Sequence, residues 1–149
     1  MSACVFCDVV RGLQDAEVYR RPAGGVYRRI RDLPASVAIL GHDQFYRGYT
    51  VVIAKTHATE LYHLADGELA EYLADMVRMA GALDKAFHPR KMNYECLGNT
   101  VAHLHWHLFP RYADDPNPRR PVWEHSHELP PVSEAEAADT IAAIRRHLK

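Results

Sequence analysis

Three histidines alternate with apolar residues along one short stretch of this 149-residue chain, as His103-Leu104-His105-Trp106-His107. Successive side chains of a β-strand point to opposite faces of the sheet. The alternation therefore predicts a strand with the three imidazoles on one face and the apolar side chains on the core face. Histidine changes charge near neutral pH, and its neutral ring nitrogen can act as a nucleophile. From the residues alone, the row could bind a metal ion or place one nucleophilic imidazole between two helpers.

A pair of cysteines near the N-terminus, Cys4-x-x-Cys7, is the second candidate site. We expect no secretion signal, because residues 1–4 carry neither a basic flank nor a long apolar stretch. In such a chain this spacing favours metal or redox chemistry over a disulfide framework. Two cysteines supply only half of a tetrahedral zinc site. The third cysteine, Cys96, is interpreted as a small apolar side chain of the core.

The elements that must position these residues follow from the apolar patterning. A three- and four-residue apolar repeat predicts one long helix over residues 66–87, capped by Asp66, and the capping box Ser133-x-x-Glu136 predicts a final helix. Pro110 is expected to end the histidine strand. Since strands come in runs rather than alternating with helices, we predict an α+β fold with a mostly antiparallel sheet, the long helix packed on it, and a C-terminal helix. The predicted strands cover residues 18–21, 26–31, 36–40, 49–54, 92–97 and 103–109.

Composition limits the partners. The chain is 48% hydrophobic and 25% charged with a formal net charge of -1, which is typical of one ordinary globular domain. A near-neutral chain does not favour nucleic acid as a partner, and no apolar run approaches the roughly 20 residues of a membrane span. Since we also expect no secretion signal, we predict a cytoplasmic protein. No glycine-rich phosphate loop is present, so histidines and backbone groups would have to bind any phosphate.

Four segments together resemble the histidine triad (HIT) family of nucleotide hydrolases and transferases. They are the triad motif at 103–109, a C-x-F-C segment at 4–7, a strand ending in K-x-H at 55–57, and Gly98-Asn99-Thr100-Val101 where many members have G-Q-[ST]-V. The resemblance spans about residues 3–112, and the H-L-H-W-H sequence is similar to a branch often labelled diadenosine-tetraphosphate hydrolase-like. It implies a HIT-like catalytic domain over residues 1–112, with residues 113–149 as a C-terminal extension packed on the same domain.

The resemblance also implies a mechanism and the roles of individual residues. His105 would attack the α-phosphorus of a nucleoside phosphate derivative, either a dinucleoside polyphosphate or an adenylylated small molecule, to form a covalent nucleotidyl-histidine. Water or another acceptor would then release the nucleotide. His103 would orient the nucleophile or ligate metal, and His107 and Asn99 would contact the phosphate.

In zinc-bearing relatives, the histidine of the K-x-H step and the first triad histidine complete the cysteine pair. Carried over, this implies a structural zinc site formed by Cys4, Cys7, His57 and His103. Such a site would also bias the ring of His103 and so tune catalysis indirectly. The resemblance further implies a homodimer.

Two other functions remain open at this point. The three histidines could instead ligate the open metal site of a metal-dependent hydrolase, although the triad strand carries no acidic residue to act as a base. The chain could also be a non-catalytic nucleotide-binding module. Substitution of His105 separates these hypotheses, because it should abolish turnover in the first case, also reduce metal content in the second, and leave the role of a binding module largely intact.

Overall fold

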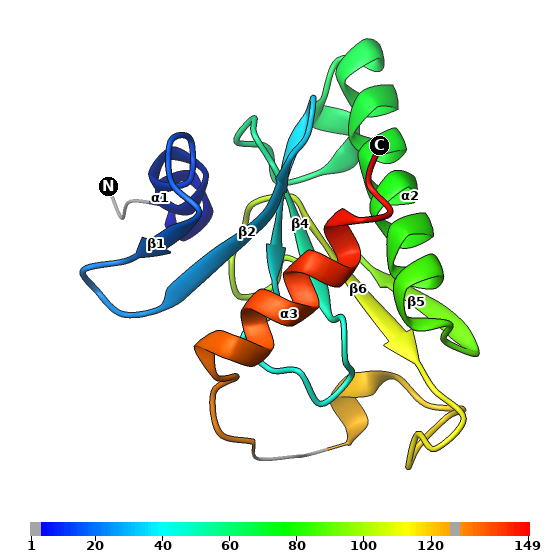
Figure 1. Cartoon of the computed structure of the whole chain (residues 1–149). Helices are drawn as coiled ribbons and strands as arrows, with labels where there is room; N and C mark the ends of the chain where they lie inside the picture. Colours follow the sequence, from blue (N-terminus) through cyan, green and yellow to red (C-terminus); the bar gives the residue numbers. More distant parts are fainter. Residues whose placement is uncertain (1–3, 126–128) are drawn as a thin grey trace.

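A six-stranded antiparallel sheet forms the centre of the molecule, with strand order β1-β2-β3-β4-β6-β5 (Figure 1). The computed structural model describes residues 4–125 and 129–149. Residues 1–3, which include the start of the family resemblance, and residues 126–128 of the expected C-terminal extension lie outside this description. The fold is α+β, as the sequence predicts. The elements are α1 (Val5–Gly12), β1 (Val18–Arg20), β2 (Val26–Asp32), β3 (Ser36–Leu40), β4 (Thr50–Ala54), α2 (Asp66–Phe87), β5 (Lys91–Glu95), β6 (His105–Arg111) and α3 (Glu134–Arg145), with 3₁₀ turns η1 (Leu61–His63) and η2 (Val122–Glu124).

The central strands are buried because both faces of the sheet are covered. In β3, Ala38 and Leu40 pack toward α2 and α3, whereas Val37 and Ile39 join the apolar cluster that contains Val9 of α1. Every residue of β3 and β4 is buried. In Figure 1, α3 crosses in front of the sheet and α2 stands to the right, whereas α1 lies apart on the left. The face that carries α1 is also the face that receives the histidines.

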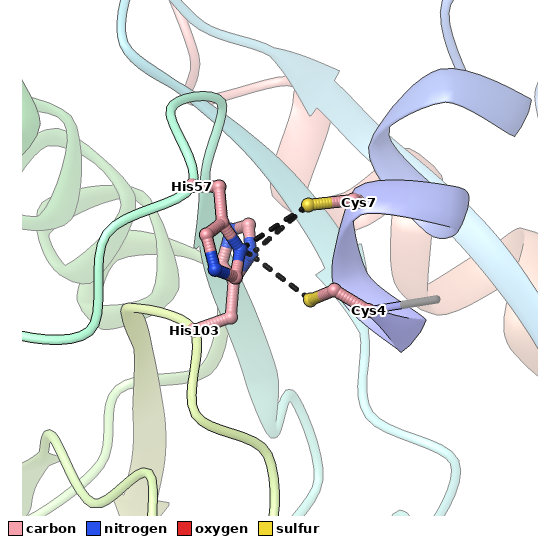
Figure 2. Close-up of side chains that lie close together, drawn as sticks. All are labelled: Cys4, Cys7, His57 and His103. Atoms are coloured by element: carbon pink, nitrogen blue, oxygen red, sulfur yellow. Dashed lines mark hydrogen bonds between the residues drawn. The ribbon is translucent and has the colours of Figure 1, made fainter. Parts of the chain in front are cut away.

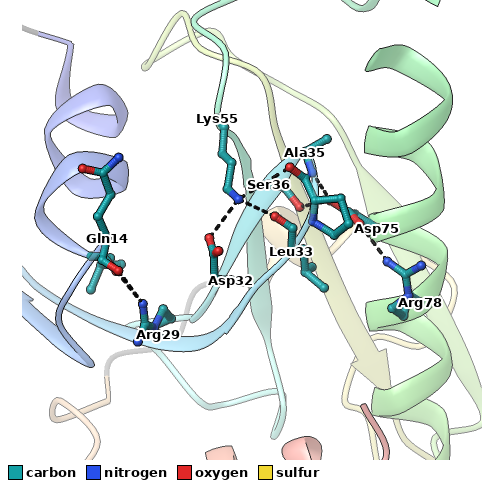
Figure 3. Close-up of polar contacts among 11 residues, drawn as sticks. Gln14, Arg29, Asp32, Leu33, Ala35, Ser36, Lys55, Asp75 and Arg78 are labelled. Atoms are coloured by element: carbon teal, nitrogen blue, oxygen red, sulfur yellow. Dashed lines mark hydrogen bonds and ion pairs between the residues drawn. The ribbon is translucent and has the colours of Figure 1, made fainter. Parts of the chain in front are cut away.

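A buried carboxylate ties α2 to the start of β3 (Figure 3). The side chain of Asp75 accepts hydrogen bonds from the backbone N–H of Ala35 at 2.9 Å and from the Ser36 hydroxyl at 2.8 Å, and it pairs with Arg78 at 2.9 Å. Asp75 is only 1% exposed. Because a buried charge is stable only when it is hydrogen-bonded or paired, these three contacts fix the helix against the sheet.

The histidine strand begins and ends later than the sequence predicts. His103 lies in the segment before β6, and β6 continues through Pro110 to Arg111. Pairing with β4 stops at Leu108, so at Pro110 the strand has a neighbour only in β5, and the missing N–H removes no bond to β4.

Helices α1 and α2 also differ in detail from the sequence prediction. α2 has the predicted bounds, but Ala65 is its N-cap and Asp66 lies in the first turn without a side-chain capping bond. A negative charge there still suits the positive end of the helix dipole. The N-terminal apolar run, to which the sequence assigned no element, forms α1.

No helix in the described ranges is both long and apolar enough to cross a membrane.

Replacing Asp75 should destabilise the fold without touching the candidate site. In Asp75→Ala, the Ala35 N–H and the Ser36 hydroxyl lose their buried acceptor, and we expect the free energy of unfolding to fall by about 3 kcal/mol. Asp84→Ala, which changes an exposed carboxylate of the same helix, should change it by less than about 0.5 kcal/mol. Urea denaturation measures the free energy of unfolding of both variants. Equal stability of the two variants would contradict the stabilising role of Asp75.

Candidate active site

Strand β6 positions His105 and His107 because it pairs on both sides. Val51 of β4 and Glu95 of β5 are the two cross-strand neighbours of His107. The alternate residues of this stretch, Leu104 and Leu108, are buried in the apolar cluster that includes α2. The histidines therefore emerge on the opposite face, toward α1. The strict alternation in the sequence predicts this separation of faces.

His105 is held in one tautomer by a backbone carbonyl. Its Nδ1 lies 2.6 Å from the carbonyl oxygen of His103. A carbonyl oxygen can only accept, so Nδ1 must carry the proton and Nε2 of the neutral ring keeps its lone pair. Burial lowers the pKa of His105 below its ordinary value, which favours the neutral ring. The residue is 6% exposed. An unprotonated Nε2 is the form that a histidine nucleophile requires.

His107 lies beside His105, with ring centroids 4.7 Å apart. Burial, followed by smaller electrostatic contributions from His105 and His42, lowers the pKa of His107 to about 4. This imidazole is therefore neutral at neutral pH. The Tyr49 hydroxyl lies 2.7 Å from its Nδ1.

A cavity of about 310 Å³ opens beside these two rings. Asn99, which the resemblance places at the phosphate, is among its lining residues. Within the described ranges, no lysine or arginine side chain lines it. The walls are therefore uncharged apart from any charge on the histidines. The lining consists of Phe6, Leu97, Gly98, Asn99, Thr100, Val101, His105, His107 and Trp123.

Trp123 reaches this cavity from the segment that follows β6. Its ring meets the ring of His107 edge-on at 5.3 Å, and its indole N–H donates to the Glu95 carboxylate. The buried guanidinium of Arg111 folds the intervening chain back, since it donates to the carbonyl oxygens of Asn117 at 2.7 Å and Arg120 at 3.0 Å. The C-terminal segment thus supplies one wall of the site.

A second group of side chains joins α1 to the histidine row (Figure 2). Sγ of Cys4 lies 3.4 Å from Nδ1 of His103, and Sγ of Cys7 lies 3.3 Å from Nδ1 of His57. The two Nδ1 atoms are 3.2 Å apart. In a tetrahedral zinc site, bond lengths of about 2.0–2.3 Å place ligand atoms about 3.3 to 3.8 Å from one another. All four ligand atoms lie within 4.8 Å of one another, so these residues could hold a metal ion.

His103 is oriented toward this group by the end of β4. Its Nε2 lies 2.8 Å from the carbonyl oxygen of Ala54, so Nε2 carries the proton and the Nδ1 lone pair faces the two cysteines and His57. Lys55, the lysine of the K-x-H step, has a structural role: it donates to the carbonyl oxygen of Leu33 and pairs with Asp32 at 3.0 Å (Figure 3).

The predicted residues thus fall into two adjoining groups. Cys4, Cys7, His57 and His103 gather around one point, and His105, His107 and Asn99 face one cavity. Sequence reasoning did not place Phe6, Tyr49 or Trp123 at the site. Phe6 lies inside the C-x-F-C motif, which offered a signal, and its ring contacts those of His103 and His105. Nothing local marks Tyr49 and Trp123, because their contacts depend on pairing and on the path of the tail.

An antiparallel sheet that carries a row of histidines beside a cysteine–histidine group is typical of a known class of proteins. The model of the HIT domain matches residues 27–114, and the chain therefore belongs to the HIT domain family. Among solved structures, a histidine triad protein from Bradyrhizobium japonicum superimposes with a TM-score of 0.73 at 28% identity, covering 83% of this chain and 91% of that one.

Two further relatives bear on chemistry. A zinc-bound histidine triad family protein from Mycobacterium smegmatis has a TM-score of 0.67 at 27% identity, covering 97% of this chain and 94% of that one. Adenosine 5'-monophosphoramidase hnt1 of Schizosaccharomyces pombe is 28% identical over 116 residues, which are 73% of this chain and 74% of that protein.

Acid should destabilise the fold partly through His107. The unfolded chain binds a proton on this ring below about pH 6.5, whereas the folded chain does so only near pH 4. Between these values the unfolded state binds more protons, so the free energy of unfolding falls as the pH is lowered. In His107→Gln, we expect about 1–2 kcal/mol of this decline to disappear, allowing for partial exposure of the ring. Urea denaturation at pH 7 and pH 4.5 measures the free energy of unfolding of wild type and His107→Gln. Equal declines in the two proteins would rule out this contribution of His107.

Proposed function

We propose that this protein is a nucleotide hydrolase or nucleotidyl transferase that cleaves at the α-phosphate of a nucleoside phosphate derivative through a covalent intermediate on His105. The observation that carries the proposal is the bond from Nδ1 of His105 to the carbonyl oxygen of His103. This hydrogen bond keeps the proton on Nδ1, so Nε2 of the neutral ring has a free lone pair. The ring lies beside a cavity large enough for a small ligand.

The proposed reaction has two displacements at phosphorus. Nε2 of His105 forms a bond to the α-phosphorus, and the bond to the leaving group breaks with its electron pair going to that group. Water or another acceptor then attacks phosphorus, and the electron pair of the phosphorus–nitrogen bond returns to Nε2 of His105. The proton that the acceptor releases balances the proton that the leaving group takes up. His107 and Asn99 line the same cavity, and we propose that they bind phosphate oxygens in both steps.

The cavity favours a small leaving group. A dinucleoside polyphosphate would bring several negative charges beside His107, and the described lining offers no lysine or arginine to neutralise them. An adenylylated small molecule carries fewer negative charges, and it would lie beside the apolar side chains of Leu97, Val101 and Trp123. The monophosphoramidase activity in the name of the fission yeast relative supports the same choice. A small nucleotide conjugate is therefore the ligand that we propose.

We also propose that Cys4, Cys7, His57 and His103 hold a structural zinc ion. Two thiolates and two imidazoles form a complete donor set, so no position would remain for a substrate. Bound zinc would lock α1 onto the residue that precedes β6. The zinc-bound mycobacterial relative supports this assignment.

Two observations make a catalytic metal on the three histidines the weaker alternative. Of the three, only His103 belongs to a cluster with metal-binding geometry in the described part of the chain. Nδ1 of His105 faces a carbonyl oxygen, and Nδ1 of His107 faces a tyrosine hydroxyl. A homodimer stays our expectation from the family resemblance, and sedimentation equilibrium measures it.

The covalent intermediate should be visible by mass. After brief mixing with adenosine phosphoramidate, intact-protein mass spectrometry should show wild type carrying one AMP. His105→Ala should show no adduct and lose turnover by at least about a thousandfold. His147→Ala removes an exposed histidine and should behave as wild type. An adduct that persists in His105→Ala, or no adduct and no product from any adenylylated amine or diadenosine tetraphosphate, would overturn the proposal.

Zinc content should depend on one pair of cysteines and not on the third. We expect about one zinc per chain in wild type and in Cys96→Ala, whose side chain packs against the α2 cluster, and a strong loss in Cys7→Ala. Elemental analysis measures the metal. Thermal unfolding should also occur at a lower temperature in Cys7→Ala, because the ion stabilises only the folded chain. Full zinc content in Cys7→Ala would exclude the proposed ligand set.

A further inference from the structure

Tyr49, the residue directly before β4, is buried beneath the histidine face of the sheet. It is 5% exposed. Its ring stacks on that of Phe109 with centroids 4.1 Å apart and an angle of 13° between the planes. The ring also lies at 24° to that of His107, with centroids 6.0 Å apart. Two residues of β6 thus flank the tyrosine, although Tyr49 and His107 are 58 positions apart in the sequence.

The backbone fixes this ring from the other side. A Cβ atom at Gly41 would lie 2.2 Å from Cδ1 of Tyr49, so the ring occupies space that only glycine leaves open. The backbone N–H of Gly41 donates to the carbonyl oxygen of Tyr49 at 2.8 Å. The backbone N–H of Tyr49 donates to the carbonyl oxygen of Tyr46 at 2.9 Å. The position of the hydroxyl is therefore set by the fold and not by a ligand.

The hydroxyl must donate its hydrogen bond to His107. Burial raises the pKa of Tyr49, with smaller contributions from Asp43 and Glu95, so the phenol stays protonated. The contact recorded for it in the described ranges is Nδ1 of His107 at 2.7 Å. If Nδ1 carried a proton, it would donate to the hydroxyl oxygen, and the buried hydroxyl proton would then have no recorded acceptor in the described ranges, which is costly. Nδ1 must therefore be the acceptor.

A neutral imidazole with an accepting Nδ1 carries its proton on Nε2. His107 therefore has the tautomer opposite to that of His105, whose proton is held on Nδ1 by a carbonyl oxygen. The two neighbouring rings differ in function for this reason: one has a lone pair at Nε2, and the other has an N–H. An N–H is the group that can donate to a phosphate oxygen without a positive charge on the ring.

We propose that Tyr49 is a positioning residue whose buried hydroxyl holds His107 in the Nε2–H tautomer, ready to donate to a substrate phosphate oxygen. The phosphate contact rests on the proposed function. The tautomer does not, and it can be measured in the protein without any substrate. These two parts can therefore fail separately.

The tautomer is tested by long-range ¹H–¹⁵N correlation spectra of the zinc-loaded protein labelled at histidine nitrogens. His107→Gln assigns the His107 signals by their loss. We expect wild-type His107 at pH 7 to show a protonated Nε2 and an unprotonated Nδ1. In Tyr49→Phe, which keeps the ring stacking, this preference should weaken to a mixture of tautomers. An Nδ1–H tautomer in wild type, or an unchanged pattern in Tyr49→Phe, would overturn the proposal.

Steady-state kinetics with adenosine phosphoramidate provide the second readout. Tyr49→Phe should lower kcat about tenfold while KM changes by less than about threefold, because a tautomer mixture weakens the donor most in the transition state. The matched control is Tyr72→Phe. It removes another buried hydroxyl, one that donates to the Val52 carbonyl oxygen on the α2 face, and it should leave kcat and the His107 spectrum unchanged. Equal losses in both variants would mean that Tyr49 acts only through stability.

Discussion

The antiparallel pairing of β6 with β4 on one side and β5 on the other is the interaction on which the rest of the structure depends. It fixes which residues of the histidine stretch face α2 and which face α1, and a shift of the register by one residue would exchange them. The same pairing places Tyr49 and Glu95 beside His107. A site built on a doubly paired strand has little freedom to move, which suits chemistry that needs fixed imidazoles.

Fixed hydrogen-bond partners then give identical imidazole side chains different roles, because they decide which ring nitrogen carries the lone pair and where it points. A carbonyl oxygen at the end of β4 turns the lone pair of His103 toward the cysteines, and the His103 carbonyl oxygen turns that of His105 toward the cavity. His103 therefore contributes to both groups, through its ring to one and through its backbone to the other. Any ion held by the cysteine–histidine group would orient the segment that positions the proposed nucleophile.

The parts of the site that the sequence predicted are those set by local patterns. Alternation with period two shows the two faces of β6, and the spacing of Cys4 and Cys7 indicates a metal-type pair. Short apolar runs cannot distinguish a strand from a helix, which is why α1 received no assignment. Trp123 could not be predicted, because its position depends on Arg111 binding backbone carbonyl oxygens, and these have no signature in the sequence. The contact of Tyr49 likewise arises from long-range register.

The close approach of Gly41 to the ring of Tyr49 has an evolutionary consequence. A side chain at position 41 and an aromatic ring at position 49 compete for the same volume, so neither position can drift independently of the other. A lineage that gains a β-carbon at 41 must first lose or shrink the ring, and with it the partner of His107. Substitutions at these two positions should therefore occur together among descendants of this chain, although they lie eight positions apart in the sequence.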